Sequence, residues 1–189
     1  RAKAIKTLKT WGGKLVEPKY TKNISISFMK QKLTELGNTP DVRRAKLKRL
    51  MNAKNIVRIL ESHNALTGII IEKLKIRDKI ELLEFDGMWS SSLTDSATRG
   101  KPDNQAVDYS TRIQGLNEIF EVTTKPLIFD ADNGGRNEHI SYTVRTLERL
   151  GASAICIEDK VGIKKNSLFS NQSLAYQDSI KNFSKKINI

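Results

Sequence analysis

A short apolar run that ends in two aspartates and a glycine pair is the feature that most constrains the fold. Residues 126–135 read Pro-Leu-Ile-Phe-Asp-Ala-Asp-Asn-Gly-Gly. A buried parallel strand has this continuous apolar character, and polar groups mark the point where such a strand emerges. Because side chains alternate along a strand, the pattern predicts that Asp130 and Asp132 point to the same side.

This pair of aspartates is a candidate metal site. Two carboxylates on one face repel each other unless a cation or a proton lies between them. Carboxylate oxygens suit a hard divalent cation such as Mg²⁺. The stretch by itself leaves an alternative open, in which Asp130 and Asp132 are solvated side chains before a Gly-Gly turn.

A second apolar run with an acidic end favours the metal site. Ser153–Ile157 is followed directly by Glu158, and His139–Leu150 lies between the two runs with apolar residues at helical spacing. Parallel strands joined by a helix place their C-terminal ends on the same side of a sheet. We therefore expect Glu158 to reach an ion held by Asp130 and Asp132.

The same strand–helix rhythm occurs four times after residue 55 and indicates an α/β fold with parallel strands. Polar clusters follow the strands, as they do in a (β/α)₈ barrel, whose active groups gather at the C-terminal strand ends. A barrel takes about 250 residues. We therefore expect a partial TIM-type barrel of about four of the eight units, preceded by a small N-terminal α/β remnant. Both ends of the sequence suggest a fragment of a longer protein.

The basic residues are concentrated in the first third of the chain. Residues 1–58 hold 16 Lys and Arg against 3 Asp and Glu, a net +13, whereas the remainder holds 17 and 18, a net −1. Such an excess is compatible with nucleic acid or nucleotide binding. Aromatic residues for base stacking are sparse there, so we favour a solvated, lysine-rich helical surface, and nucleic acid is not the expected partner.

Composition indicates a cytoplasmic protein without a membrane span. No run approaches the roughly 20 apolar residues that cross a bilayer, and the basic N-terminal stretch lacks the apolar core of a signal peptide. The single cysteine, Cys156, excludes a disulfide framework and favours a reducing compartment. Because it lies inside an apolar run, we expect it in the core.

Several motifs in order make the chain resemble the phosphoenolpyruvate mutase family of the isocitrate lyase and phosphoenolpyruvate mutase superfamily. The resemblance runs from about residue 43 to residue 187. It rests on Glu61-Ser-His-Asn64, Phe85-Asp-Gly-Met-Trp89, Ser91-Ser-Leu93, Lys101-Pro-Asp103, Asp130-Ala-Asp132, Glu158-Asp-Lys160 and Lys164-Lys-Asn-Ser167. Residues 41–189 are thus interpreted as the N-terminal half of a mutase-like barrel.

Residues 1–40 are similar to the C-terminal tail of a cytidylyltransferase-like domain plus a linker. Trp11–Pro18 and the segment near Ile24 carry this similarity. The nucleotide-binding motif of that family departs here, because it reads Ile24-Ser-Ile-Ser27. The resemblance therefore leaves nucleotide transfer by this chain open.

The resemblance implies a reaction and a cofactor. Family members interconvert phosphoenolpyruvate and phosphonopyruvate, the entry to phosphonate biosynthesis, with Mg²⁺ as a Lewis acid on the substrate oxygens. Asp130 is expected as the direct metal ligand, and Asp132 and Glu158 are expected to hold metal-bound waters. The resemblance also implies a homo-oligomer for the full-length parent.

The resemblance assigns further roles at the site. Asp103 matches the proposed phosphoryl acceptor, either as a transient nucleophile or as a group that steers a metaphosphate-like species. Catalytic donors are expected in the loop of residues 161–170, which gates the site in the family. They are Lys164 and Asn166. The residues expected to bind substrate are Trp89, Ser91, Ser92, Leu93, Lys160 and Ser167.

Three other functions compete with the mutase. A carbon–carbon lyase of the superfamily carries a Cys in the gating loop, where this chain has Lys164-Lys-Asn-Ser167. A phosphonopyruvate hydrolase keeps most of the same groups and admits water. A fragment that catalyses nothing is the alternative of another class, because the later strands of a barrel would be needed for activity; we expect the 189-residue chain itself to be inactive.

Overall fold

The protein divides into two compact units, Arg1–Lys32 and Leu33–Ile189. The computed structural model describes residues 2–16, 39–77, 82–162, 164–165 and 176–188. Within the first unit, helix α1 (Ala2–Lys9) forms over the apolar stripe of the sequence and ends in a turn at Gly12. Residues 14–16 do not form the strand that their apolar character suggests.

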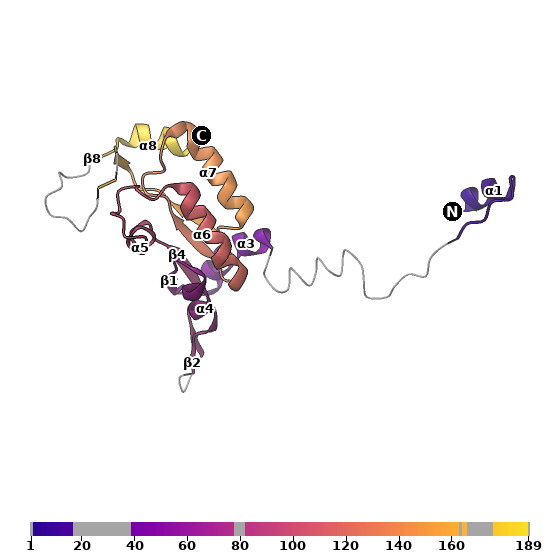
Figure 1. Ribbon diagram of the computed structural model, residues 1–189, viewed down its shortest axis with the longest axis horizontal. Helices are drawn as coiled ribbons and strands as arrows, with labels where there is room; N and C mark the ends of the chain where they lie inside the picture. The colour runs from indigo at the N-terminus through magenta and orange to yellow at the C-terminus, as the bar shows by residue number, and fades with distance from the viewer. Residues whose placement is uncertain (1, 17–38, 78–81, 163, 166–175, 189) are drawn as a thin grey trace. The chain divides into compact units, whose positions relative to one another are not determined.

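A parallel sheet of four strands organises the second unit (Figure 1). Its order is β1 (Ile59–Glu61), β4 (Gly87–Ser90), β5 (Leu127–Asp130) and β6 (Ala154–Cys156). Every neighbouring pair is parallel. The sequence prediction of an α/β fold with about four strand–helix units of a barrel is confirmed.

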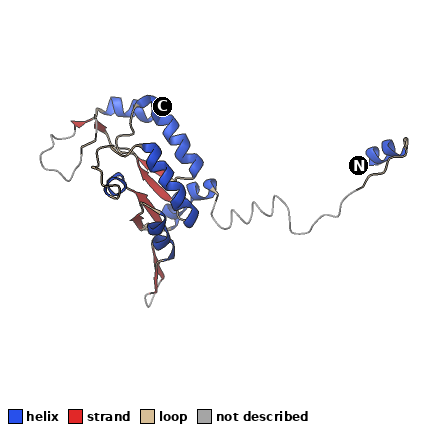
Figure 2. Ribbon diagram, in the orientation of Figure 1, coloured by secondary structure: helices blue, strands red, loops and turns tan. Residues whose placement is uncertain are grey.

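Helix α3 (Pro40–Ala53) precedes the first strand, and the other helices of this unit are interspersed with the strands along the chain (Figures 1 and 2). They are α4 (Ala65–Lys73), α5 (Ser92–Ala97), α6 (Tyr109–Val122), α7 (Asn137–Leu150) and α8 (Ile180–Ile187). Helix α6 packs against both α4 and α7, and α3 packs against α7. Among the described residues, none of the helices has the length and apolar character needed to pass through a lipid bilayer.

Two antiparallel strand pairs interrupt the strand–helix order, and the sequence prediction did not include these pairings. One pairs β2 (Lys75–Arg77) with β3 (Leu82–Glu84), between α4 and β4. The other pairs β7 (Lys160–Val161) with β8 (Tyr176–Gln177), after β6. These strands are only two or three residues long, which is too short to show an apolar periodicity.

The hydrophobic core lies between the sheet and the helices. Met88, Leu127 and Phe129 are 0% exposed, and Leu116 and Ile119 of α6 pack in the same cluster. The strands are buried on their inner positions because parallel strands are covered by the helices that connect them. This core fixes the strand ends whose polar residues form the candidate site.

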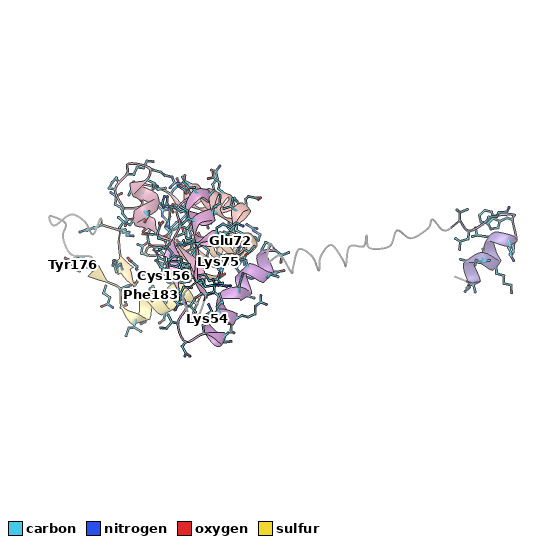
Figure 3. All side chains as sticks on the ribbon, turned by 90° about the horizontal axis from the view of Figure 1, so that it is seen from below. Lys54, Glu72, Lys75, Cys156, Tyr176 and Phe183 are labelled. Atoms are coloured by element: carbon cyan, nitrogen blue, oxygen red, sulfur yellow. The ribbon has the colours of Figure 1, made fainter. Side chains whose placement is uncertain are left out.

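A polar clasp closes the opposite end of the sheet, before β5 begins. Glu72 of α4, labelled in Figure 3, accepts hydrogen bonds from the hydroxyl of Thr123 at 2.7 Å and from the backbone and hydroxyl of Thr124 at 3.2 and 3.1 Å. Burial raises the pKa of Glu72, but these hydrogen bonds outweigh burial and leave it below its usual value.

Arg43 of the basic helix α3 is part of the same clasp. It is 3% exposed, donates to the backbone oxygens of Thr123 at 2.8 Å and of Phe120 at 3.1 Å, and lies 4.2 Å over the Phe120 ring. At least one basic residue of the first third therefore serves the fold and is withdrawn from any nucleic-acid surface.

Cys156 is exposed, so the prediction that it is a core residue is wrong (Figure 3). It is the last residue of β6, which stands at one end of the four-stranded order and pairs with β5. Among the described residues no further strand flanks β6, and an apolar sequence run is not buried where its sheet has no neighbour on that side.

Gly151 provides a test of how α7 ends against α3. It caps α7 with φ +98°, and a Cβ there would lie 2.8 Å from the Cα of Pro40. We expect Gly151→Ala to lower the free energy of unfolding by at least about 1 kcal/mol, because side chains disfavour left-handed backbone. Urea unfolding followed by circular dichroism measures this.

Gly115, inside α6, is the matched control. A Cβ there would meet only the Arg99 guanidinium at 3.6 Å, an ordinary contact. We expect Gly115→Ala to raise the free energy of unfolding by roughly 0.5–1 kcal/mol, since alanine favours helix. Equal effects of the two substitutions would contradict the cap assignment.

Candidate active site

Asp130 and Asp132 lie at the C-terminal end of β5, and the chain turns sharply between them. The strand ends at Asp130, and Asp132 has a left-handed backbone with φ +49°, a conformation that Asp tolerates better than most residues. Asp130 Oδ1 accepts a hydrogen bond from the backbone N–H of Asp132 at 3.0 Å. The two carboxyl groups are neighbours because of this turn, and not because they share the face of an extended strand.

Ser92, at the start of α5, holds the other oxygen of Asp130. Its backbone N–H and its hydroxyl donate to Asp130 Oδ2 at 3.2 and 3.0 Å. Ser91 is the N-cap of α5, and Ser92 is 2% exposed. The segment expected to bind a substrate carboxylate is therefore adjacent to the candidate metal ligands, and two of its donors are directed at Asp130.

Lys164 brings the segment after β7 into contact with the acids. Its ammonium lies 2.9 Å from Asp103 Oδ2 and 2.5 Å from Asp132 Oδ1, and it also donates to the hydroxyl of Ser92. The Asp103 and Asp132 side chains are each 3% exposed. Residues from three separate loops thus form one buried cluster.

The electrostatics of this cluster favour a charged lysine. Burial lowers the pKa of Lys164, but the interactions with Asp132 and Asp103 outweigh burial and raise it above its usual value. Burial raises the pKa of Asp132 and the charge of Asp130 adds to that effect, while Lys164 opposes it. The ammonium therefore compensates acids that would otherwise be costly to bury.

Arg112 and Asp95 are buried at the same place, and the motif analysis missed both. Arg112 Nε donates to Asp95 Oδ2 at 2.9 Å, and Nη1 lies 3.5 Å from Asp132 Oδ2. Arg112 shares the buried stripe of α6 with Leu116 and Ile119. A charged residue at core spacing in a helix was the sequence signal that could have revealed it.

Glu158 approaches the turn through its backbone. Its N–H donates to the carbonyl oxygen of Asp132 at 2.7 Å, while its carboxylate pairs with Lys160 at 2.8 Å. In the described parts of the chain, no three His, Cys, Asp or Glu side chains gather as a metal site requires. Asp130, Asp132 and Glu158 therefore stay a predicted ligand set for one ion.

The donor set nevertheless fits Mg²⁺ in its chemistry. Mg²⁺ usually keeps several waters and takes only one or two carboxylates from the protein. Asp103 Oδ1 is buried without a hydrogen-bond partner among the described residues, and Asp132 Oδ1 faces a positive charge. These are hard oxygen atoms in a site already arranged for a cation.

The remaining predicted residues border the cluster or lie outside the described part of the chain. Trp89 is half-buried in β4, in register with Ile128 of β5. Leu93 is half-buried in α5, and Lys160 begins β7. Asn166 and Ser167 fall in residues 166–175, which the structure does not describe.

Comparison with known proteins assigns the chain to a family. The family described as phosphoenolpyruvate phosphomutase matches residues 47–188, so the chain belongs to this family. The phosphoenolpyruvate phosphomutase of Tetrahymena pyriformis is 30% identical over 126 residues, which are 66% of this chain and 39% of that protein. The chain spans about two fifths of the length of this relative.

Two solved structures share the fold. The phosphoenolpyruvate phosphomutase of Streptomyces platensis subsp. rosaceus has a TM-score of 0.66 and 30% identity, covering 76% of this chain and 47% of that one. A phosphonopyruvate hydrolase in complex with oxalate and Mg²⁺ has a TM-score of 0.62 and 26% identity, covering 77% and 46%. A relative in the same fold group thus contains magnesium.

Lys164→Met tests the charge compensation in the cluster. The substitution leaves Asp103 and Asp132 buried without this ammonium, and breaking a buried ion pair costs on the order of 3 kcal/mol. We expect a loss of that size in urea unfolding at pH 7. Lys160→Met is the control, because the Lys160 and Glu158 side chains are 43% and 32% exposed and such pairs contribute about 1 kcal/mol or less. Equal losses would contradict the compensation.

The raised pKa of Lys164 also predicts a pH dependence. Its folded-state pKa lies above the usual value of 10.5, so its stabilising effect is fully present below that pH and is lost as the pH rises through the folded-state pKa. We expect the stability difference between wild type and Lys164→Met to be constant from pH 7 to about 10 and to shrink above it. Thermal unfolding measures this, and a difference unchanged at pH 12 would contradict it.

Proposed function

We propose that this chain carries the N-terminal half of the active site of a Mg²⁺-dependent phosphoenolpyruvate mutase, which interconverts phosphoenolpyruvate and phosphonopyruvate. The observation that carries the proposal is the contact of Lys164 with Asp103 and Asp132 in one buried cluster at the C-terminal strand ends. Family membership over residues 47–188 supports it. The reaction moves a phosphoryl group between oxygen and carbon, as phosphonate biosynthesis requires.

We assign the metal to the acids around β5. Asp130 would hold the ion directly, and Asp132 and Glu158 would hold it through water. When bound, Mg²⁺ supplies a Lewis acid for the negative charge on the substrate oxygens. Asp130 is already oriented by Ser92, and the position of Glu158 is fixed by its backbone contact with Asp132.

The protein groups around the phosphoryl position bind and orient it. The Lys164 ammonium neutralises charge on the phosphoryl oxygens, together with Asn166 of the same loop. Asp103 faces the phosphoryl group, either as its acceptor or as the group that steers a metaphosphate-like species during transfer. Because the Asp103 and Asp132 side chains are 3% exposed, the loop contact keeps water from the phosphoryl group, which a transfer to carbon needs.

The substrate carboxylate is assigned to the start of α5. Ser91 offers its hydroxyl there and Leu93 its backbone N–H, since loop donors favour anions. Ser92, whose N–H and hydroxyl donate to Asp130, lies between them. Trp89 forms the wall of the site, and Lys160 and Ser167 complete the binding groups. The parent protein is proposed to be a cytoplasmic homo-oligomer.

A hydrolase is the second candidate, favoured by the structural likeness to a phosphonopyruvate hydrolase at 26% identity. It would use the same acids and admit water to the phosphoryl group. The two functions differ in product, because a mutase forms phosphoenolpyruvate and a hydrolase forms pyruvate and phosphate.

We also propose a division of the chain into a nucleotidyltransferase remnant, residues 1–40, and a mutase half-barrel, residues 41–189. The 189-residue polypeptide by itself is proposed to be inactive. In the described residues the sheet has four strands, and β1 and β6 each pair with one strand. A barrel active site takes groups from the ends of several different strands, and an open sheet of this kind does not supply the full set.

Product analysis by phosphorus NMR tests these proposals. With phosphonopyruvate and Mg²⁺, we expect no turnover by the 189-residue chain, and turnover would refute its inactivity. Residues 41–189 joined to the second half of the Streptomyces platensis enzyme should form phosphoenolpyruvate. Formation of phosphate would identify a hydrolase.

Lys164→Met in that fusion is the matched variant. We expect it to lower kcat by about 100-fold to 1,000-fold, because it removes a positive group from the transferring phosphoryl oxygens. Gly115→Ala, whose added methyl group makes only an ordinary 3.6 Å contact with the Arg99 guanidinium, should keep the activity. Full activity of the Lys164 variant would contradict the assigned role.

A further inference from the structure

Arg112 contacts the acidic cluster through the oxygen of Asp132 that Lys164 does not use. Its Nη1 lies 3.5 Å from Asp132 Oδ2, whereas Lys164 lies 2.5 Å from Oδ1. The Arg112 side chain is 1% exposed and that of Asp132 is 3% exposed. Each oxygen of this carboxylate therefore has its own positive neighbour, one on helix α6 and one in the segment after β7.

The same guanidinium is anchored on three other sides. Nε donates to Asp95 Oδ2 at 2.9 Å and Nη2 donates to the carbonyl oxygen of Ser90 at 3.3 Å. Its central carbon lies 4.5 Å over the ring of Phe129. Arg112 thus joins the end of β4, helix α5 and the core strand β5, and it cannot shift without disturbing all of them.

Hydrogen bonds to Asp130 and Glu158 hold the backbone of Asp132, but they do not involve its carboxylate, which needs an anchor of its own. Asp132 lies beyond the end of β5, in a left-handed turn with φ +49°, where no strand pairing fixes the direction of its side chain. A carboxylate that binds a cation through water must present one defined oxygen. Partners behind the ligand are known to provide that orientation in metal sites generally.

We propose that Arg112 is a positioning residue: its ion pair with Oδ2 of Asp132, at 3.5 Å and without a hydrogen bond, orients the carboxylate so that Oδ1, which pairs with Lys164 in this structure, faces the cation site. Asp95 fixes the guanidinium in turn. This inference rests on the proposed function, because it assumes that Asp132 serves a bound divalent cation. A guanidinium suits this role, since its planar fork of donors reaches two acids at once, while an ammonium is a single point of charge.

Substitution of Arg112 by lysine distinguishes the effect of Arg112 on the orientation of Asp132 from the effect of its positive charge. The net charge near the site stays the same, so a change in cation affinity reports the orientation of Asp132. The matched control is Arg99→Lys. Arg99 also pairs with Asp95, at 3.3 Å, but its side chain is 31% exposed, and among the described contacts it has none with Asp132.

The experiment titrates the 189-residue chain with Mn²⁺ in place of Mg²⁺ and follows free Mn²⁺ by electron paramagnetic resonance, well below the melting temperature of each variant. We expect Arg112→Lys to raise the Kd for Mn²⁺ about tenfold and Arg99→Lys to leave it unchanged. Asp95→Asn, which keeps the side-chain shape, should raise the Kd in the same direction, and the double variant should add little to Arg112→Lys. If Arg112→Lys does not fold, the Kd of Asp95→Asn for Mn²⁺ tests the proposal by itself.

A purely structural role for Arg112 predicts a different result. The melting temperature would fall, but Mn²⁺ would bind with the wild-type Kd, and that outcome overturns the inference while leaving the metal assignment intact. Additive losses in the double variant would also overturn it, because they would mean that Asp95 and Arg112 act separately. Wild-type protein that binds no Mn²⁺ would remove the metal assignment and the inference with it.

Discussion

The site depends on the compensation of buried negative charge at the C-terminal end of a parallel sheet. Asp103 and Asp132 are 3% exposed, and isolated carboxylates at that depth would be strongly unfavourable. Lys164 and Arg112 supply the positive partners. These four groups come from four segments of the chain, so their ion pairs also fix how those segments meet. The balance of charge is therefore the main structural constraint on the site.

The charges of this cluster match the chemistry that is expected of the family. A phosphoryl group in transfer carries negative charge on several oxygens, and a site that binds it needs positive groups held in a dry environment. Lys164 lies in such an environment, because it bridges two acids whose side chains are 3% exposed. The acids at the end of β5 add the hard oxygen atoms that a magnesium ion prefers.

Much of the fold was predictable because apolar periodicity reports burial. The runs before Asp130 and Glu158 became strands β5 and β6, and the stripe before Gly151 became helix α7. The exposure of Cys156 was not predictable, since it depends on whether a strand lies beyond β6. The motif order placed Asp103 and Lys164 in one site, but it could not show that they touch each other.

The sequence by itself determined the parallel α/β sheet, the acids at its strand ends and the family, because each of these is written in local patterns and motif order. Only the tertiary structure decided which charges meet. Arg112 is an ordinary basic residue in a helix until α6 packs against β5, and Asp132 leaves the strand face because its backbone turns at φ +49°. Pairing across loops depends on distances in space, and no spacing along the chain encodes those distances directly.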